Sequence, residues 1–265
     1  MFRDFPWILL RGVVLALTVS LLISPNPSTA QKAVQDCKKA VKLYNQGTES
    51  KDHIQKVKLF EEASRLCEDP EVLARVYNNL ADVYEQKGEL SQALVQYRQA
   101  IKIKKDLVSP YSSVGDIFFK LGDYYSAFVM YGKALKIKPD DEDSIKGRDK
   151  AEAAYKKKMI IYFERGSSKV GEEYAYRLQL VGEIIKNNPK GKIQVVGHTC
   201  DLGSKEFNKR LGSKRAEAVA QYLKDKFFLS ENIISLKAQG KEYPVLLNKD
   251  EEARILNRRV KVQIK

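Results

Sequence analysis

The stretch "VVGHTCDLGS" contains three side chains that could do chemistry, namely His198, Cys200 and Asp201. The whole chain has only two histidines and three cysteines. An imidazole, a thiol and a carboxylate at this spacing could bind a metal or pair a nucleophile with its base. They could also occupy a loop between a strand and a helix. The choice decides whether the protein is an enzyme or a binding protein.

Both chemical interpretations lack a necessary group. A tetrahedral metal site needs a fourth ligand, and the other histidine, His53, lies in the other half of the chain. A nucleophile and its base usually come from convergent elements, whereas Cys200 and His198 lie two residues apart with no obvious oxyanion loop. We therefore expect no metal, no cofactor and no catalysis, and a structural hydrogen-bonding role for His198 at the end of a strand.

The elements around this loop have the periodicity of an α+β domain. Four runs have the composition and length of strands, namely "MIIYFE", "KIQVVGH", "ISLKAQG" and "RRVKVQI". Two segments between them have helical spacing, "EYAYRLQLVGEIIKNN" and "NKRLGSKRAEAVAQYLKDKF". The order β-α-β-α-β-β over residues 158–265 predicts a mixed sheet with its helices packed on one face.

The preceding half contains an internal repeat with a period of 34 residues. Small, aromatic and glycine positions recur with this shift: Leu80, Ala81, Tyr84, Gly88, Ala93, Tyr97 and Ala100 correspond to Val114, Gly115, Phe118, Gly122, Ala127, Tyr131 and Ala134. Small residues let paired helices approach closely, and a glycine ends the first helix. The pattern resembles the tetratricopeptide repeat (TPR). We expect an α-helical TPR domain over residues 31–157, with a polar capping helix at its end.

The sequence of the repeats shows no candidate nucleophile, metal-binding cluster or phosphate-binding loop. They could form a rigid spacer or a concave surface for a protein partner. A divergent first unit precedes residue 70, with Cys37 near the start of its first helix and Cys67 near the end of its second. Antiparallel packing would bring these ends together, so we expect either a Cys37–Cys67 disulfide or two buried free thiols.

Residues 1–30 have the features of a secretory signal peptide. Arg3 and Arg11 precede the apolar run "GVVLALTVSLLI", which is short for a membrane span, and "SPNPSTA" supplies prolines and small residues before Gln31. An uncleaved membrane anchor is the alternative. The full chain carries a net charge of +13, which favours anionic partners; in an exported protein an anionic wall polymer or lipid is favoured over nucleic acid.

The second half resembles the OmpA-like peptidoglycan-binding domain, a family shared by Pal lipoproteins, MotB and OmpA. The resemblance covers residues 158–265 and rests on "GHTCDLGS", "FNKRLGSKRAEAVAQYL", "GKEYP" and "NRRVKVQI". It implies non-covalent binding of the diaminopimelate residue of the peptidoglycan stem peptide. The residues that it implies for the groove are Arg215, Leu211, Asn208, Glu164, His198, Cys200, Asp201 and Arg258.

Two positions depart from the family pattern. Cys200 occupies the place of the usual aspartate after "GHT", and Gly212 replaces the usual serine after Leu211. A shift of one residue in the loop could let Asp201 supply the missing carboxylate. Alternatively, Cys200 is a small packing residue and Asp201 caps the following helix.

Arg215 is the residue that the pattern favours most for ligand binding. An arginine can donate two parallel hydrogen bonds to a ligand carboxylate. The buried helical stripe Ala216, Val219, Ala220 and Leu223 turns Arg215 towards the loop, so its truncation is expected to leave the melting temperature nearly unchanged.

The sequence therefore predicts a non-catalytic periplasmic protein at the interface of the outer membrane and peptidoglycan. The OmpA-like domain is expected to bind the wall, and the repeats an unidentified envelope protein. The alternative is an envelope scaffold whose OmpA-like domain has lost wall binding and makes only protein contacts.

Overall fold

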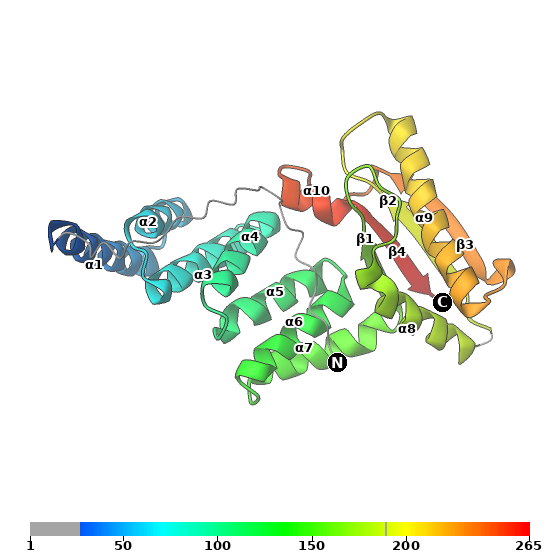
Figure 1. Cartoon of the computed structure of the whole chain (residues 1–265), viewed down its shortest axis with the longest axis horizontal. Coiled ribbons are helices and arrows are strands. Elements are labelled where there is room, and N and C mark those ends of the chain that lie inside the picture. Colours follow the sequence, from blue (N-terminus) through cyan, green and yellow to red (C-terminus); the bar gives the residue numbers. More distant parts are fainter. Residues whose placement is uncertain (1–26, 189) are drawn as a thin grey trace, which may run out of the picture.

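The computed structural model describes residues 27–188 and 190–265 of the chain (Figure 1). The apolar run of the predicted signal peptide lies outside the described residues, and the predicted cleavage position before Gln31 falls within the first helix. None of the described helices is long and apolar enough to cross a membrane.

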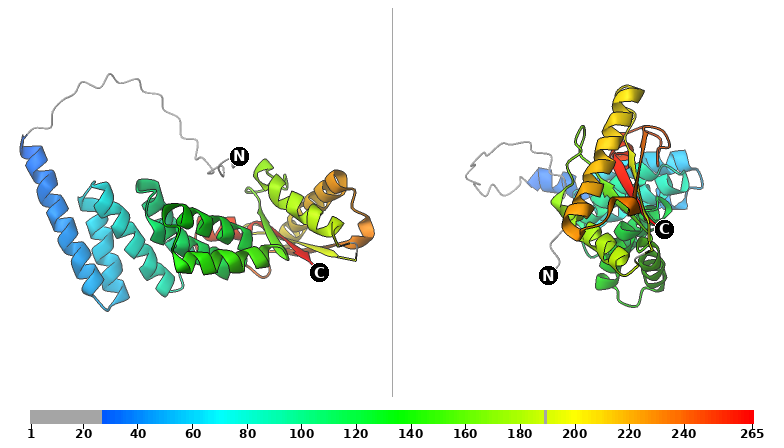
Figure 2. Two further views of the ribbon diagram at one scale, coloured as in Figure 1. Left: turned by 90° about the horizontal axis from the view of Figure 1, so that it is seen from below. Right: turned by 90° about the vertical axis from the view of Figure 1, so that its right-hand side faces the viewer.

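The N-terminal half is a stack of antiparallel helices, each packed against the next (Figures 1 and 2). The stack consists of α1 (Pro27–Glu49), α2 (His53–Leu66), α3 (Pro70–Gln86), α4 (Leu90–Ile103), α5 (Val108–Lys120), α6 (Tyr124–Ile137) and α7 (Glu142–Tyr155).

The 34-residue repeat has the same construction in both of its units. The hydroxyl groups of Tyr97 and Tyr131 donate to Asp82 and Asp116, respectively, each at 2.6 Å. Each aromatic ring therefore fills the space inside a helix pair while its polar end is bonded to the neighbouring helix. This agreement between the units confirms the predicted TPR architecture.

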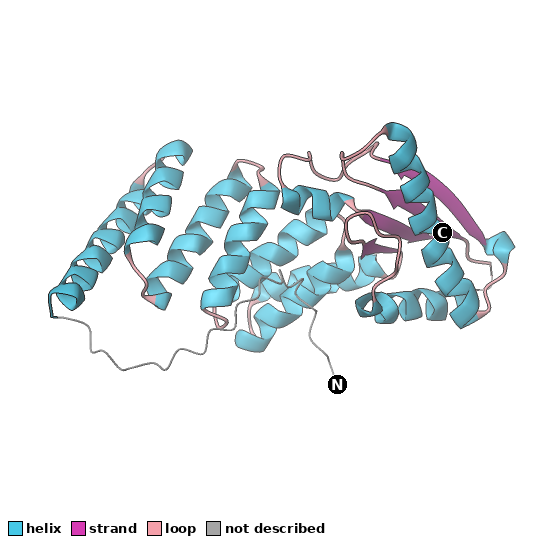
Figure 3. Cartoon of the chain, turned by 45° about the horizontal axis from the view of Figure 1, so that its top comes forward, coloured by secondary structure: helices cyan, strands magenta, loops and turns pink. Residues whose placement is uncertain are grey.

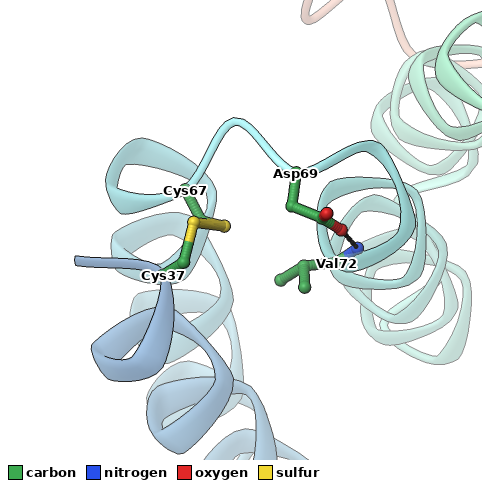
Figure 4. The surroundings of a disulfide bond; sticks show 4 residues. All are labelled: Cys37, Cys67, Asp69 and Val72. Carbon is green, nitrogen blue, oxygen red and sulfur yellow. Dashed lines mark hydrogen bonds between the residues drawn. A yellow bond between two sulfur atoms is a disulfide. The ribbon is translucent and has the colours of Figure 1, made fainter. Parts of the chain in front are cut away.

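The divergent first unit carries the disulfide bond shown in Figure 4. Cys37 in α1 and Cys67 directly after α2 are bonded, with an S–S distance of 2.07 Å and a Cα–Cα distance of 4.5 Å. Asp69 begins the next helix there, because its carboxylate accepts a hydrogen bond from the Val72 amide at 3.0 Å. Cys200 is the free cysteine of the described part of the chain, and it is buried.

The C-terminal half contains a four-stranded mixed sheet with the order β1-β4-β2-β3. β2 and β3 are parallel, whereas β4 runs antiparallel to both β1 and β2. The strands are β1 (Lys158–Tyr162), β2 (Ile193–His198), β3 (Ile234–Gly240) and β4 (Arg259–Ile264).

Two helices, α8 (Ala175–Lys186) and α9 (Lys205–Phe227), pack on one face of the sheet (Figure 3). Short 3₁₀ turns precede α8 and β3, at Glu172–Tyr174 and Glu231–Ile233. The predicted buried stripe of α9 is correct, since Ala216, Val219 and Leu223 lie in the core beneath the sheet. The predicted mixed α+β architecture is confirmed.

The predicted order omitted one helix. α10 (Glu251–Asn257) lies between β3 and β4, and Asp250 caps it by accepting a hydrogen bond from the Ala253 amide at 2.8 Å. The helix is too short to show a clear period in the sequence. It packs beside α4 of the repeats (Figure 1), where Leu256 joins the repeat core and Ser91 donates to Asp250 at 2.7 Å.

Candidate functional site

A pocket of about 260 Å³ lies where β2 ends and α9 begins. Its walls come from the loop after β1, the loop between β2 and α9, the first turns of α9, and the junction between α10 and β4. The lining residues are Arg165, Gly166, Thr199, Cys200, Leu202, Gly203, Phe207, Asn208, Leu211, Arg215 and Arg258. The structure thus brings five of the eight predicted groove residues to one cavity.

Two glycines bring α9 close enough to β2 to form this pocket. A Cβ atom on Gly197 would lie 1.9 Å from the carbonyl oxygen of Gly212, and one on Gly212 would lie 3.0 Å from the carbonyl oxygen of Gly197. A larger residue at either position would push the helix away from the strand. Glycine at position 212, where the family pattern has serine, thus follows from this close approach.

Arg215 is fully buried, with 0% of its surface exposed. Its guanidinium donates to the backbone carbonyls of Ser167 at 2.8 Å, His198 at 3.1 Å and Glu164 at 3.0 Å. It also lies over the Phe163 ring, 5.1 Å from the centroid. Arg215 lies at the loop that holds Cys200, which is the direction that its helical phase gives. The loop after β1 folds over this side of α9 and buries the side chain.

Arg258 is the second buried cation of the pocket. Its side chain donates to Glu251 at 2.8 Å and to the Phe163 carbonyl at 3.3 Å. Burial, together with the charge of Arg258, lowers the pKa of Arg215 to about 10. Arg215 therefore remains charged at neutral pH, and the pocket is a cationic site.

Cys200 and Thr199 form the floor beside these cations. Both are buried, at 5% and 2% exposed. The Thr199 hydroxyl oxygen has no hydrogen-bond partner among the described residues. A buried, unpaired hydroxyl costs free energy unless a ligand or water satisfies it. Thr199 is therefore a candidate binding residue that the sequence interpretation missed.

Asp201 does not line the pocket. Its carboxylate pairs with Arg254 of α10, with Nε–Oδ1 2.9 Å and Nη2–Oδ2 3.4 Å. The hydrogen bond from Arg254 lowers the pKa of Asp201. Asp201 also does not cap α9: Ser204 is the capping residue, and its hydroxyl accepts from the Phe207 amide at 3.1 Å. The capping alternative for Asp201 was therefore wrong.

The remaining predicted residues stabilise or line the walls of the pocket, or lie next to it. Asn208 is buried and donates to the carbonyls of Leu202, Gly203 and Ser204 at 2.8, 3.3 and 3.0 Å, which closes the loop. Leu211 lines the pocket.

Glu164 contributes its backbone carbonyl, while its side chain is exposed. His198 likewise contributes a carbonyl to Arg215. Its buried ring lies outside the lining, and burial together with Arg259 and Lys261 lowers its pKa to about 3.

The pocket also has members that only the fold reveals. Phe207, 47% exposed, forms an apolar wall at the mouth, and the exposed Arg165 lies at the rim. Phe207 could have been suspected from its place in the first turn of α9, but Arg165 carries no signal in the sequence. Across residues 27–188 and 190–265, no group of three or more His, Cys, Asp or Glu side chains could hold a metal ion.

Comparison with known proteins agrees with this arrangement. The profile described as "OmpA family" matches residues 162–258, and repeat profiles described as "TPR repeat" and "Tetratricopeptide repeat" match residues 81–122 and 108–141. The peptidoglycan-associated lipoprotein of Pseudomonas aeruginosa is 32% identical over 120 residues, which are 45% of this chain and 70% of the relative. The chain belongs to the OmpA family.

Two further relatives match part of the chain. The peptidoglycan-associated lipoprotein of Legionella pneumophila is 32% identical over 102 residues, and this chain spans 57% of its length while the match covers 38% of this chain. A crystal structure of the peptidoglycan-associated lipoprotein from Burkholderia pseudomallei is 33% identical, covering 40% of this chain and 89% of that one, with a TM-score of 0.39.

Proposed function

We propose that this protein is a non-catalytic component of the cell envelope that binds peptidoglycan non-covalently through the pocket between β2 and α9. The observation that carries this proposal is the buried guanidinium of Arg215 at a cavity, in a chain whose relatives are named peptidoglycan-associated lipoproteins. The ligand that we propose is the diaminopimelate residue of the stem peptide.

The geometry supports a carboxylate contact in this pocket. Three N–H groups of Arg215 donate to backbone carbonyls, which fix the plane of the guanidinium. A guanidinium has five N–H donors, so these three bonds leave two of them uncommitted. A preoriented arginine of this kind loses little side-chain entropy when it binds a carboxylate.

The repeats are proposed to hold a protein partner. α10 covers part of α4, and Arg98 pairs with Glu252 there at 2.6 Å. A partner would therefore use a part of the stack that α10 leaves open, such as the hollow between α2, α3 and α4 that includes Tyr77 and Val95. Val95 is 38% exposed and offers an apolar contact. The proposed location is the periplasm, at the outer membrane–peptidoglycan interface, with no nucleic-acid partner.

Cys200 favours a second candidate function. A thiol supplies no charge for the ammonium of a diamino acid, so an OmpA-family domain with Cys200 could serve protein contacts alone. The two functions differ in whether the purified protein sediments with the wall.

Sedimentation with isolated peptidoglycan tests the proposal. The wild-type protein should sediment with the wall, whereas Thr199→Val and Arg215→Lys should reduce the bound fraction. Arg148→Lys, which changes a partly exposed arginine of α7, is the matched control and should bind like the wild type. A wild-type protein that stays in the supernatant would leave the scaffold function as the explanation.

A further inference from the structure

The pocket is unusual in the balance of its charges. Two buried arginines, Arg215 and Arg258, reach it, and Arg165 adds a third cation at its rim. No acidic side chain is among the residues that line it within the described chain. The carboxylate of Glu251 meets Arg258 from outside the cavity, with its own side chain 57% exposed. The interior therefore has a surplus of positive charge.

The remaining surface of the cavity is mostly apolar. Phe207, Leu211 and Leu202 provide carbon walls, and Cys200 closes the floor between them and the arginines. Thr199 also lines this space, and its hydroxyl is buried and has no hydrogen-bond partner among the described residues. A cationic end with a spare hydrogen-bonding group and an aliphatic remainder is the complement of a carboxylate on a hydrocarbon chain.

The acidic residue nearest to Cys200 in the sequence, Asp201, is already paired with an arginine outside the pocket. Asp201 follows Cys200 directly, but both of its carboxylate oxygens face Arg254 of α10. Arg254 is further fixed by a bond of 3.2 Å to the Asn248 carbonyl. Asp201 would have to give up this bidentate contact and reverse its direction to reach the cavity. The pocket thus holds no anion for a positively charged group on a ligand.

We propose that the pocket recognises its ligand as an anion, through an aliphatic carboxylate, and gives no counter-charge to an ammonium group on the same molecule. Cys200 is then the residue that determines specificity. This inference rests on the proposed function, because it names the chemical class of ligand for the same pocket. An ammonium group inside the cavity would be repelled by Arg215 and Arg258, because no carboxylate there offsets their charge. We therefore expect wall fragments to bind with their amino groups either outside in solvent or acylated and so uncharged.

Two acids with the same seven-carbon chain test this inference. Pimelate and meso-diaminopimelate differ only in the two ammonium groups, and calorimetric titration of the full-length protein at about 0.15 M salt screens non-specific attraction. We expect the wild-type protein to bind pimelate at least about tenfold more tightly than diaminopimelate. Thr199→Val should weaken pimelate binding, which separates the pocket from the general positive charge of the protein.

A charge at position 200 should invert this preference. Cys200→Asp should place a carboxylate beside Arg215 and favour diaminopimelate over pimelate by about tenfold. This is a change of about a hundredfold from the wild-type ratio, within the range of one charged hydrogen bond. Cys200→Asn has the same shape without the charge and should keep the wild-type order. If Cys200→Asp fails to fold, the ratio measured with the wild-type protein is sufficient.

Three results would overturn the inference: wild-type protein that prefers diaminopimelate, wild-type protein that binds neither acid at about 10 mM, or a Cys200→Asp variant with an unchanged ratio. Sedimentation with intact peptidoglycan is measured separately. Wall binding with a preference for diaminopimelate would contradict this inference and leave the proposed function standing. Tight binding of pimelate without binding of the wall would contradict the proposed function and leave this inference standing.

Discussion

The guanidinium of Arg177 in α8 and the carboxylate of Asp123 at the start of α6 form a buried ion pair between the two halves of the molecule. The Nη1 atom of Arg177 lies 3.2 Å from Oδ1 of Asp123, and the two side chains are 2% and 1% exposed. Arg177 also donates to the Ile160 carbonyl at 2.6 Å and to Ser126 at 2.8 Å. Its guanidinium lies 4.6 Å from the ring centroid of Tyr125. The repeat stack and the OmpA-family domain therefore share one polar core.

Arg177→Ala should destabilise the whole protein, because it leaves Asp123 buried without its cation. Removing one partner of a buried pair costs about 3–5 kcal/mol. Urea denaturation should show this loss in the free energy of unfolding. Arg177→Ala combined with Asp123→Ala should recover part of it. A single variant that loses less than about 1 kcal/mol would mean that the halves are not held by this pair.

Arg215→Ala should lower both wall binding and stability, contrary to what its helical phase alone suggests. The variant leaves one buried and two partly buried carbonyls without their charged donor, at a cost of about 3–5 kcal/mol. The melting temperature and the sedimented fraction should therefore be measured on the same samples. An unchanged melting temperature would contradict the bonds to Ser167, His198 and Glu164.

The bond between Cys37 and Cys67 should stabilise the first helical unit. Thiol counting on the denatured, unreduced protein should give one free thiol, that of Cys200. Cys37→Ser combined with Cys67→Ser should lower the free energy of unfolding of this unit by about 2–4 kcal/mol. A count of three thiols in protein isolated from the envelope would refute the bridge there.

His198 should make the OmpA-family domain sensitive to acid. Its pKa is lowered to about 3 in the folded state, whereas an unfolded histidine titrates near its ordinary value of 6.5. Between these two pH values the unfolded state binds more protons, so stability is full above about pH 6.5 and falls as the pH decreases. The slope from this residue is at most about 1.4 kcal/mol per pH unit.

His198→Gln should flatten that part of the pH profile. Denaturation of both proteins at several pH values between 4 and 8 isolates the contribution of His198 from that of the carboxylates. Parallel profiles for the variant and the wild type would mean that the pKa of His198 is the same in the folded and the unfolded state.

Gly197→Ala should disrupt the packing of α9 on β2 and so distort the pocket, because the added Cβ would collide with the Gly212 carbonyl oxygen. The expected loss of stability is about 2 kcal/mol or more. Gly132→Ala is the matched control: a Cβ atom at Gly132 meets nothing within 4 Å, and alanine favours a helix. Equal stability of the two variants would show that α9 can move away from β2 without cost.

The sequence by itself determined the parts of this protein that depend on local pattern. The 34-residue period fixes the helix pairs, because each aromatic residue must meet the small residues of its own unit. Strand alternation and helical spacing likewise gave the mixed α+β domain. The loop beginning at His198 was assigned to a site through the resemblance of "GHTCDLGS" and the following helix to the OmpA-like domain.

Tertiary structure decided which of the polar residues serve the fold and which serve the site. The helical phase of Arg215 is a local property, but its burial depends on the loop after β1, some fifty residues earlier in the chain. Asp201 is adjacent to Cys200 in sequence, yet Arg254 of the unpredicted helix α10 draws its carboxylate away from the pocket. The pair Arg177–Asp123 joins two halves that no periodicity connects. The local sequence pattern determines which way a side chain points from its helix or strand. The charges around that side chain come from segments distant in sequence, which are brought together only when the chain folds.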